Sequence, residues 1–233
     1  NVGEYRYPLG GKLYVFNKNE NIGFIKGHMC SPAIATQAED LIAGGVKELI
    51  HVGYAGGLQP ELVPGEIILT DGAFNDTAVA RVYGYDYDII HSSKDLTNEI
   101  EEMITSAEIL YKRGFHWTTD AGYRETWGQV MDYRDKGALC VEMEGVGLFT
   151  IANYRKCVAT GIYVVSDVYL EDDWKLGWEG NDIKKAVAKA QSPDELMESF
   201  SDLSPQAAKE AFFRGAEEGG RLLYDISEGN GRP

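Results

Sequence analysis

Residues 138–153 have the sequence ALCVEMEGVGLFTIAN, and this stretch gives the clearest indication of how the chain folds. The run 138–141 is short and apolar, as expected for a buried strand, and 144–153 has the length and apolar content of a buried helix. Glu142 and Glu144 stand at the junction, where burying an unpaired carboxylate is costly. A capping role at the helix start, favoured by the helix dipole, explains one of them. It explains two less easily, so the junction is a candidate site.

Short apolar runs alternate with amphipathic stretches on both sides of this junction, a pattern typical of an α/β domain. The other expected strands are Lys12–Phe16, Asn21–Lys26, Glu48–Val52, Glu66–Thr70 and Val158–Val165. The other expected helices are Ala33–Ala43, Leu96–Lys112, Asp182–Ala190, a short one near Asp194–Phe200, and Pro205–Ser227 with Ser204 as N-cap. The sequence has no internal repeat and no low-complexity linker, so we expect one domain over residues 1–233, with 205–233 as a C-terminal helix and tail.

Composition and charge restrict the class of protein. A chain of 233 residues with 44% apolar residues fits one large domain. Its net charge of −15 argues against a nucleic-acid polymer as partner, and a small anion would need a local pocket of donors. No apolar run has the length to cross a bilayer, no export leader is recognisable, and the three cysteines form no C-x-x-C pair. We therefore expect a cytoplasmic protein with no membrane partner.

Two more polar features follow expected strands, where α/β proteins usually bind ligands. The first is Gly53–Gly57, which predicts a glycine-rich turn. Closely spaced glycines let backbone N–H groups approach a small anion or a sugar, although a tight turn without a ligand is the simpler interpretation. The second is Asp167, directly after the strand 158–165 and Ser166. It can act as a general acid, although capping the next segment is the simpler interpretation for this residue alone.

Three segments together resemble the nucleoside phosphorylase-I superfamily: VGYAGGLQPELVPGEI at 52–67, VEMEG at 141–145 and VVSD at 164–167. This superfamily includes purine nucleoside phosphorylases, uridine phosphorylases and methylthioadenosine/S-adenosylhomocysteine nucleosidases, and residues 117–126 are similar to a uridine phosphorylase-like branch. The resemblance implies a three-layer α/β/α sandwich with a central mixed sheet. It also implies cleavage of the N-glycosidic bond of a nucleoside by phosphorolysis, to free base and ribose 1-phosphate, as a pentosyltransferase of purine or uridine salvage. A hydrolytic nucleosidase of the same fold and a non-catalytic nucleoside-binding relative are the alternatives.

The resemblance assigns expected roles to the residues at the strand ends. Glu144 would accept hydrogen bonds from the ribose 2′- and 3′-hydroxyls, with Met143 packed on the sugar face and Glu142 nearby. These hydroxyls become better donors as the sugar ring turns cationic, so the interaction would strengthen in the transition state. Asp167 would protonate or hydrogen-bond N7 of a purine leaving group, oriented by Ser166.

The expected phosphate or water site, formed by His51, Gly53, Tyr54 and Arg6, departs from the superfamily pattern. Phosphorolytic members resemble this chain here but carry Arg where His51 stands and Ser or Thr where Tyr54 stands. Arg offers phosphate a planar fork of donors, whereas His offers at most two and is mostly neutral at pH 7. Arg6 corresponds loosely to an arginine supplied by a neighbouring subunit, and the superfamily's first strand, with its phosphate loop, would lie before Asn1. Water therefore stays open as the nucleophile.

The sequence does not identify the base. Tyr123 and Arg124 fall near the base-contacting residues of the superfamily, but Gly122 stands where purine enzymes tend to place a stacking Phe. The resemblance implies a small-molecule nucleoside as substrate, inorganic phosphate as co-substrate without another cofactor, and a homo-oligomer, either a dimer or a trimer of dimers. The four histidines are scattered without metal-ligand spacing, so no metal site is expected.

Overall fold

The computed structural model describes residues 2–6, 12–16, 19–170, 174–176 and 221–226. The strands are β1 (Val2–Arg6), β2 (Lys12–Phe16), β3 (Asn19–Lys26), β4 (Val46–Gly57), β5 (Ile67–Asp76), β6 (Ile89–His91), β7 (Tyr111–Thr119), β8 (Cys140–Glu142), β9 (Val158–Tyr169), β10 (Trp174–Leu176) and β11 (Arg221–Ile226). The helices are α1 (Ser31–Ala43), α2 (Val79–Val82), α3 (Lys94–Ser106), the 3-10 helix η1 (Gly122–Arg124), α4 (Trp127–Asp135) and α5 (Gly145–Arg155). No helix in these ranges is long and apolar enough to cross a membrane.

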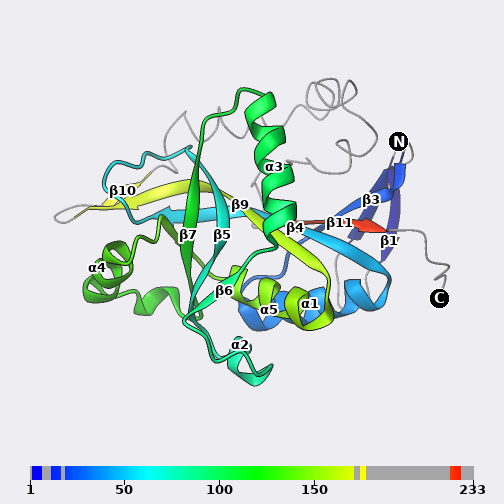
Figure 1. The fold of residues 1–233 in the computed structure, drawn as a ribbon, viewed down its shortest axis with the longest axis horizontal. Coiled ribbons are helices and arrows are strands. Elements are labelled where there is room, and N and C mark those ends of the chain that lie inside the picture. The colour runs from blue at the N-terminus through cyan, green and yellow to red at the C-terminus, as the bar shows by residue number, and fades with distance from the viewer. Residues whose placement is uncertain (1, 7–11, 17–18, 171–173, 177–220, 227–233) are drawn as a thin grey trace.

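The described strands form one sheet in the order β1-β2-β3-β11-β4-β8-β7-β5-β9-β10, with β6 paired to β5 (Figure 1). Because β4 also pairs with β9, the strands β4, β8, β7, β5 and β9 close into a ring. The ring contains parallel pairs, such as β4 with β9, and antiparallel pairs, such as β4 with β8. The expected mixed α/β fold with a central mixed sheet is therefore confirmed, while the three-layer arrangement stays a prediction.

Helices cover the sheet from separate sides. Helices α1 and α5 pack on each other and share an apolar cluster with Leu49 of β4. Helix α3 packs over β5 and β9, and its apolar side chains form a second cluster that includes Ile50 of β4. Successive side chains of a strand point to opposite faces, so the adjacent residues Leu49 and Ile50 serve the two clusters in turn. Figure 1 shows α3 well apart from the α1 and α5 pair.

The glycines after residue 52 form part of a strand, so the predicted turn over Gly53–Gly57 is wrong. Strand β4 continues to Gly57 because it pairs with β9 from Glu48 to Gly57. A Cβ atom at Gly56 would lie 2.9 Å from the ring of Tyr169, and one at Gly57 would lie 3.1 Å from Val165. These glycines therefore allow neighbouring strands to approach closely, which is a second common use of glycine in sheets.

The predicted helix Leu96–Lys112 is too long at its C-terminal end. Helix α3 ends at Ser106, and Glu108 follows with the left-handed φ of 54° that reverses the chain. Residues 111–112 already belong to β7, which pairs with β5 from Ile67 onward. Pairing with a buried neighbour therefore overrides the helical spacing at this boundary.

The predicted helix Pro205–Ser227 is wrong where the structure describes it. Residues 221–226 form strand β11, which pairs antiparallel with both β3 and β4. An extended segment at this place satisfies the backbone groups of two strands, a tertiary requirement that local apolar spacing does not reveal. The other predicted helices after residue 180 lie outside the described residues. The remaining predicted strands and helices are confirmed, with shifts at their ends.

Candidate active site at the start of helix α5

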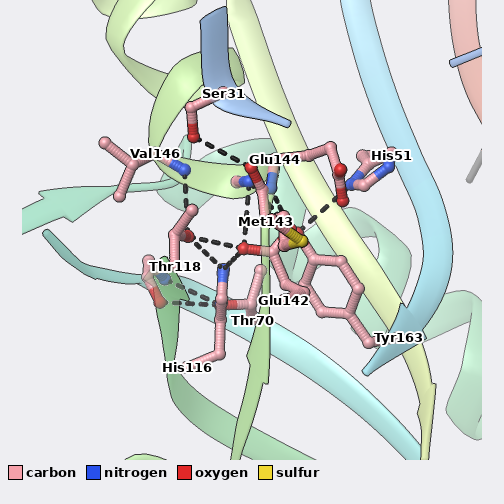
Figure 2. Close-up of polar contacts among 12 residues, drawn as sticks. Ser31, His51, Thr70, His116, Thr118, Glu142, Met143, Glu144, Val146 and Tyr163 are labelled. Atoms are coloured by element: carbon pink, nitrogen blue, oxygen red, sulfur yellow. Dashed lines mark hydrogen bonds and ion pairs between the residues drawn. The ribbon is translucent and has the colours of Figure 1, made fainter. Parts of the chain in front are cut away.

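Glu144 lies between β8 and α5 but does not cap its own helix. It occupies the N-cap position, and its side chain accepts no capping hydrogen bond. One carboxylate oxygen instead accepts from the backbone N–H of Cys30 at 2.6 Å, in the loop before α1. The hydroxyl of Ser31 donates to the carbonyl oxygen of Met143 at 3.0 Å (Figure 2). Two polar contacts thus fasten the start of α1 to the residues that begin α5.

Glu142 is the carboxylate that holds the helix start. Its oxygens accept from the backbone N–H groups of Glu144 at 2.8 Å and Gly145 at 2.9 Å. The hydroxyl of Thr118 also donates to it, and Nε2 of His116 lies 3.1 Å from Oε1 (Figure 2). Glu142 is only 5% exposed. The capping interpretation therefore fits Glu142, which lies behind Glu144 with both oxygens occupied rather than open to a ribose.

The different surroundings drive the pKa values of the two carboxylates apart. Burial, and then the negative charge of Glu142, raise the pKa of Glu144 to about 8. Burial alone would raise the pKa of Glu142 as well, but His116, His51 and the Thr118 hydroxyl lower it to about 2. Carboxylates separated in this way commonly have different functions in one site. Here Glu142 is the permanent anion, and Glu144 is the group that changes protonation near neutral pH.

His51 lies in the same buried polar group, on β4. Its Nδ1 is 3.3 Å from the hydroxyl of Tyr163, and its Nε2 has no hydrogen-bond partner among the described residues although the side chain is 1% exposed. Burial lowers the pKa of His51 to about 4, so its ring is neutral at pH 7. A neutral buried imidazole does not supply the charge that Arg would bring to phosphate.

Asp167 lies near the end of β9, within a second group of polar side chains. The hydroxyl of Ser166 donates to its carboxylate, as the predicted orienting role requires. The hydroxyl of Tyr169 donates to Glu125 at 2.8 Å, and burial followed by the charge of Asp167 raises the pKa of Glu125. A Cβ atom at Gly56 would lie 2.9 Å from the Tyr169 ring and 3.5 Å from Asp167 Oδ2. Asp167 and Tyr169 therefore lie beside Gly56, and the Tyr169 hydroxyl connects this point to Glu125.

Gly122 lies close to one residue of the group around Glu144 and to one residue of the group around Asp167. A Cβ atom at this position would lie 3.5 Å from Glu125 Oε1 and 3.9 Å from the sulfur of Met143. Met143, at the expected ribose end, and Glu125, the hydrogen-bond partner of Tyr169, thus both lie close to the backbone of η1. Tyr123 and Arg124, in the same 3-10 helix, are exposed, and their role in base binding stays a prediction.

The expected phosphate residues are less well assembled within this chain. Gly53 and Tyr54 follow His51 on β4, and Gly53 is buried while Tyr54 is half-buried. Arg6 ends β1, which β2, β3 and β11 separate from β4 in the sheet. In the described residues, the hydrogen bonds that hold Glu125, Glu142 and Glu144 come from backbone N–H groups, hydroxyls and His116, and none comes from Lys or Arg. The part of the site that the described residues form is therefore predominantly acidic.

Sequence reasoning missed His116 and Glu125. His116 had no metal-ligand spacing, and its only signal is its position between the aromatic residues Phe115 and Trp117. A polar residue at a buried strand position requires a partner, which points toward a carboxylate such as Glu142. Glu125 stands in a loop, and no pattern in the sequence places it beside Tyr169.

Comparisons with known proteins identify relatives. A family model described as the phosphorylase superfamily matches residues 2–196. A DeoD-type purine nucleoside phosphorylase of Exiguobacterium sibiricum is 33% identical over 139 residues, which are 58% of this chain and 59% of that protein. A DeoD-type purine nucleoside phosphorylase of Caldanaerobacter subterraneus subsp. tengcongensis is 32% identical over 156 residues, 62% of this chain and 67% of that protein. The chain thus matches about three fifths of the length of the first relative and two thirds of the length of the second.

Proposed function

Because the chain belongs to the phosphorylase superfamily, we propose that it cleaves the N-glycosidic bond of a nucleoside whose ribose is held by Glu144. The observation that carries this proposal is that Glu142 and Glu144 have different hydrogen-bond partners and therefore different roles. Glu142 caps α5, so Glu144 is released from that structural task and is held instead by the Cys30 N–H. A carboxylate fixed in this way suits two adjacent sugar hydroxyls, which are both donors.

The proposed reaction uses the two ends of the site in one step. The bond between C1′ and the base nitrogen breaks, its electron pair moves to the base, and positive charge develops on the sugar. Glu144 stabilises that charge through hydroxyls that become stronger donors in the transition state. Asp167 delivers a proton to, or hydrogen-bonds, N7 of the leaving purine. The nucleophile then forms a new bond to C1′.

Inorganic phosphate is the proposed nucleophile, because the matched relatives are named as purine nucleoside phosphorylases. The same names favour a purine as the base. Water is the second candidate, and one observation favours it: the neutral, buried His51 stands where phosphorolytic members carry Arg. A homo-oligomer and a role in salvage stay predictions from the resemblance, and a cytoplasmic location stays a prediction from the composition.

The test is an assay of free base released from a panel of purine and pyrimidine nucleosides, with and without inorganic phosphate. Phosphorolysis predicts that release requires phosphate and yields ribose 1-phosphate. Release of base at the same rate without phosphate would contradict phosphorolysis and show that the reaction is hydrolysis. No release of base from any nucleoside would contradict the proposed activity and favour the alternative of a non-catalytic, nucleoside-binding protein.

Substitution of Glu144 tests the residue that carries the proposal. We expect Glu144→Ala to lower kcat/KM by at least about 100-fold, because the lost interaction belongs to the transition state. The fold should persist, which circular dichroism and the melting temperature measure. Near-normal activity in this variant would refute the assignment of Glu144 to the ribose.

A further inference from the structure

We propose that His116 is a positioning residue of this site, which holds the ribose-binding Glu144 in place by anchoring Glu142 at the start of α5. The inference rests on the proposed function of Glu144 and adds a residue from β7 to it. It concerns a side chain that is completely buried and therefore acts through its neighbours rather than through a substrate.

Both ring nitrogens of His116 are held by neighbours. Nε2 lies 3.1 Å from Glu142 Oε1, and Nδ1 lies 2.6 Å from the hydroxyl of Thr70 on β5 (Figure 2). A carboxylate is only an acceptor, so Nε2 carries the hydrogen of this bond. The Thr70 hydroxyl, which can donate or accept, contacts Nδ1 and so fixes the orientation of the ring. His116 is thus oriented as a donor toward Glu142.

Glu142 transmits this contact to Glu144. The same carboxylate that His116 contacts accepts the backbone N–H groups of Glu144 and Gly145. Removing the His116 donor would leave a buried carboxylate with fewer partners, which is costly in a site of low polarity. The start of α5 would then shift, or Glu142 would take up a proton. The first change would move Glu144, and the second would change the electrostatic environment of its carboxylate.

Gly145 shows that the helix start and the imidazole fit each other. A Cβ atom at residue 145 would lie 2.4 Å from Nε2 of His116 and 3.0 Å from the hydroxyl of Tyr163. The position of a side chain at 145 is thus occupied by the imidazole. The pairing of His at 116 with Gly at 145 is a geometric requirement of this site, and it predicts that the two positions are energetically coupled.

The charged and titratable groups around Glu142 and Glu144 determine how loss of His116 changes the pKa values of these two carboxylates. Glu142 faces His116 from β7, His51 from β4, and Tyr163 and Cys140 from β9 and β8. Glu144 faces Glu142, Tyr163 and the thiol of Cys30. The negative charge of Glu142 is one cause of the raised pKa of Glu144. Loss of His116 favours protonated Glu142, and this removes the like charge and lowers the pKa of Glu144.

The experiment compares His116→Leu with His116→Gln, because the Gln amide places an N–H donor near the position of Nε2 and Leu places none. We measure kcat and KM from pH 5.5 to 9.5, and we titrate the ¹³C-labelled glutamate carboxyls by NMR, with Glu144→Gln to assign the Glu144 signal. In the Leu variant we expect kcat on the alkaline plateau to fall by about 10- to 100-fold, as for a misplaced group. We also expect the Glu144 titration to move to lower pH by roughly one unit. The Gln variant should recover most of both properties.

An unchanged Glu144 titration in a folded Leu variant, with activity lost equally in the Gln variant, would overturn the proposal and leave His116 a structural residue. The NMR titration requires no turnover, so it tests the positioning role even if the proposed function fails.

A coupling measurement covers the case in which His116→Leu does not fold. We expect Gly145→Ala to lower the melting temperature strongly in the natural background and much less in His116→Ser, where the added methyl group has room. An equal effect of Gly145→Ala in both backgrounds would contradict the geometric pairing.

Discussion

Glu142 and Glu144 are separated by one residue and have different tasks. In an extended strand, side chains two residues apart point to the same face. This rule does not apply to Glu142 and Glu144, because the chain turns from β8 into α5 between them. Their difference arises from partners that are distant in sequence, namely Thr118 and His116 for Glu142 and Cys30 for Glu144. The sequence could therefore predict that one carboxylate caps the helix, but not which one.

The raised pKa of Glu144 predicts a pH profile. Only the ionised carboxylate accepts two hydrogen bonds from ribose hydroxyls without competition from its own proton, and ionisation increases as pH rises. With a pKa of about 8 in the free protein, log(kcat/KM) should rise with a slope near one below pH 8 and level off above it. The ionised fraction at pH 6 implies a rate about 100-fold below the plateau. A profile that stays flat from pH 6 to 9 would contradict control by Glu144.

Substitution of Asp167 separates base recognition from sugar recognition. We expect Asp167→Asn to lower kcat/KM for purine nucleosides by about 100- to 1,000-fold, because the amide has no acidic proton for N7. Pyrimidine nucleosides have no N7, so their loss should be smaller. Ser166→Ala is the matched control: it removes the hydroxyl that donates to Asp167, and its effect should be milder. Equal losses on both classes of nucleoside would argue against an acid directed at N7.

At the scale of elements, the sequence predicted most strands and helices but not the contacts that terminate them. Helix α1 and strand β2 follow local signals, namely the spacing of apolar residues and Gly44 after the helix. The errors occur where a partner far along the chain determines the structure, as β9 does for the glycines of β4 and β3 does for β11. Periodicity within a window contains no information on such partners. For the same reason the sequence indicated Glu144 and Asp167 as candidates but did not indicate His116, whose partner Glu142 lies on another strand.

The packing of α1 on α5 supplies a prediction at this scale. A Cβ atom at Gly147 would lie 2.5 Å from the carbonyl oxygen of Ser31, a backbone atom at the start of α1. Gly147→Ala should therefore separate the two helices and destabilise the fold by about 1–3 kcal/mol. It should also lower activity, because Cys30, which holds Glu144, moves with α1. Unfolding in urea and the nucleoside assay measure the two effects.

Gly128→Ala in α4 is the matched control for this substitution. A Cβ atom at Gly128 meets nothing within 4 Å, so Ala should be neutral or stabilise the helix by up to about 1 kcal/mol. If both substitutions proved equally harmless, close contact between α1 and α5 would not be the reason for glycine at 147.

At the scale of the whole molecule, the negative charge of the protein opposes the binding of phosphate, the proposed co-substrate. The chain has a net charge of −15, and the described part of its site is predominantly acidic. The ring of five strands brings Glu142 of β8 and Asp167 of β9 into one site, so closure of the sheet also concentrates negative charge. A phosphorolytic reaction in this site requires cations in addition to the residues that hold Glu125, Glu142 and Glu144. A hydrolytic reaction requires none, because water is neutral.

This difference leads to a prediction about charged ligands. We expect a neutral nucleoside to have a kcat/KM at least about 10-fold higher than its 5′-monophosphate, because the field of the protein repels the anion. Raising the ionic strength from about 0.02 to 0.5 M should narrow this ratio, because salt screens repulsion beyond several ångströms. The nucleoside alone should show little salt dependence, and this serves as the internal control. If phosphate is the nucleophile, its KM should fall with added sodium chloride for the same reason. A KM for phosphate that rises steeply with salt would instead indicate a strongly cationic site, assembled from residues that outweigh the carboxylates around Glu144.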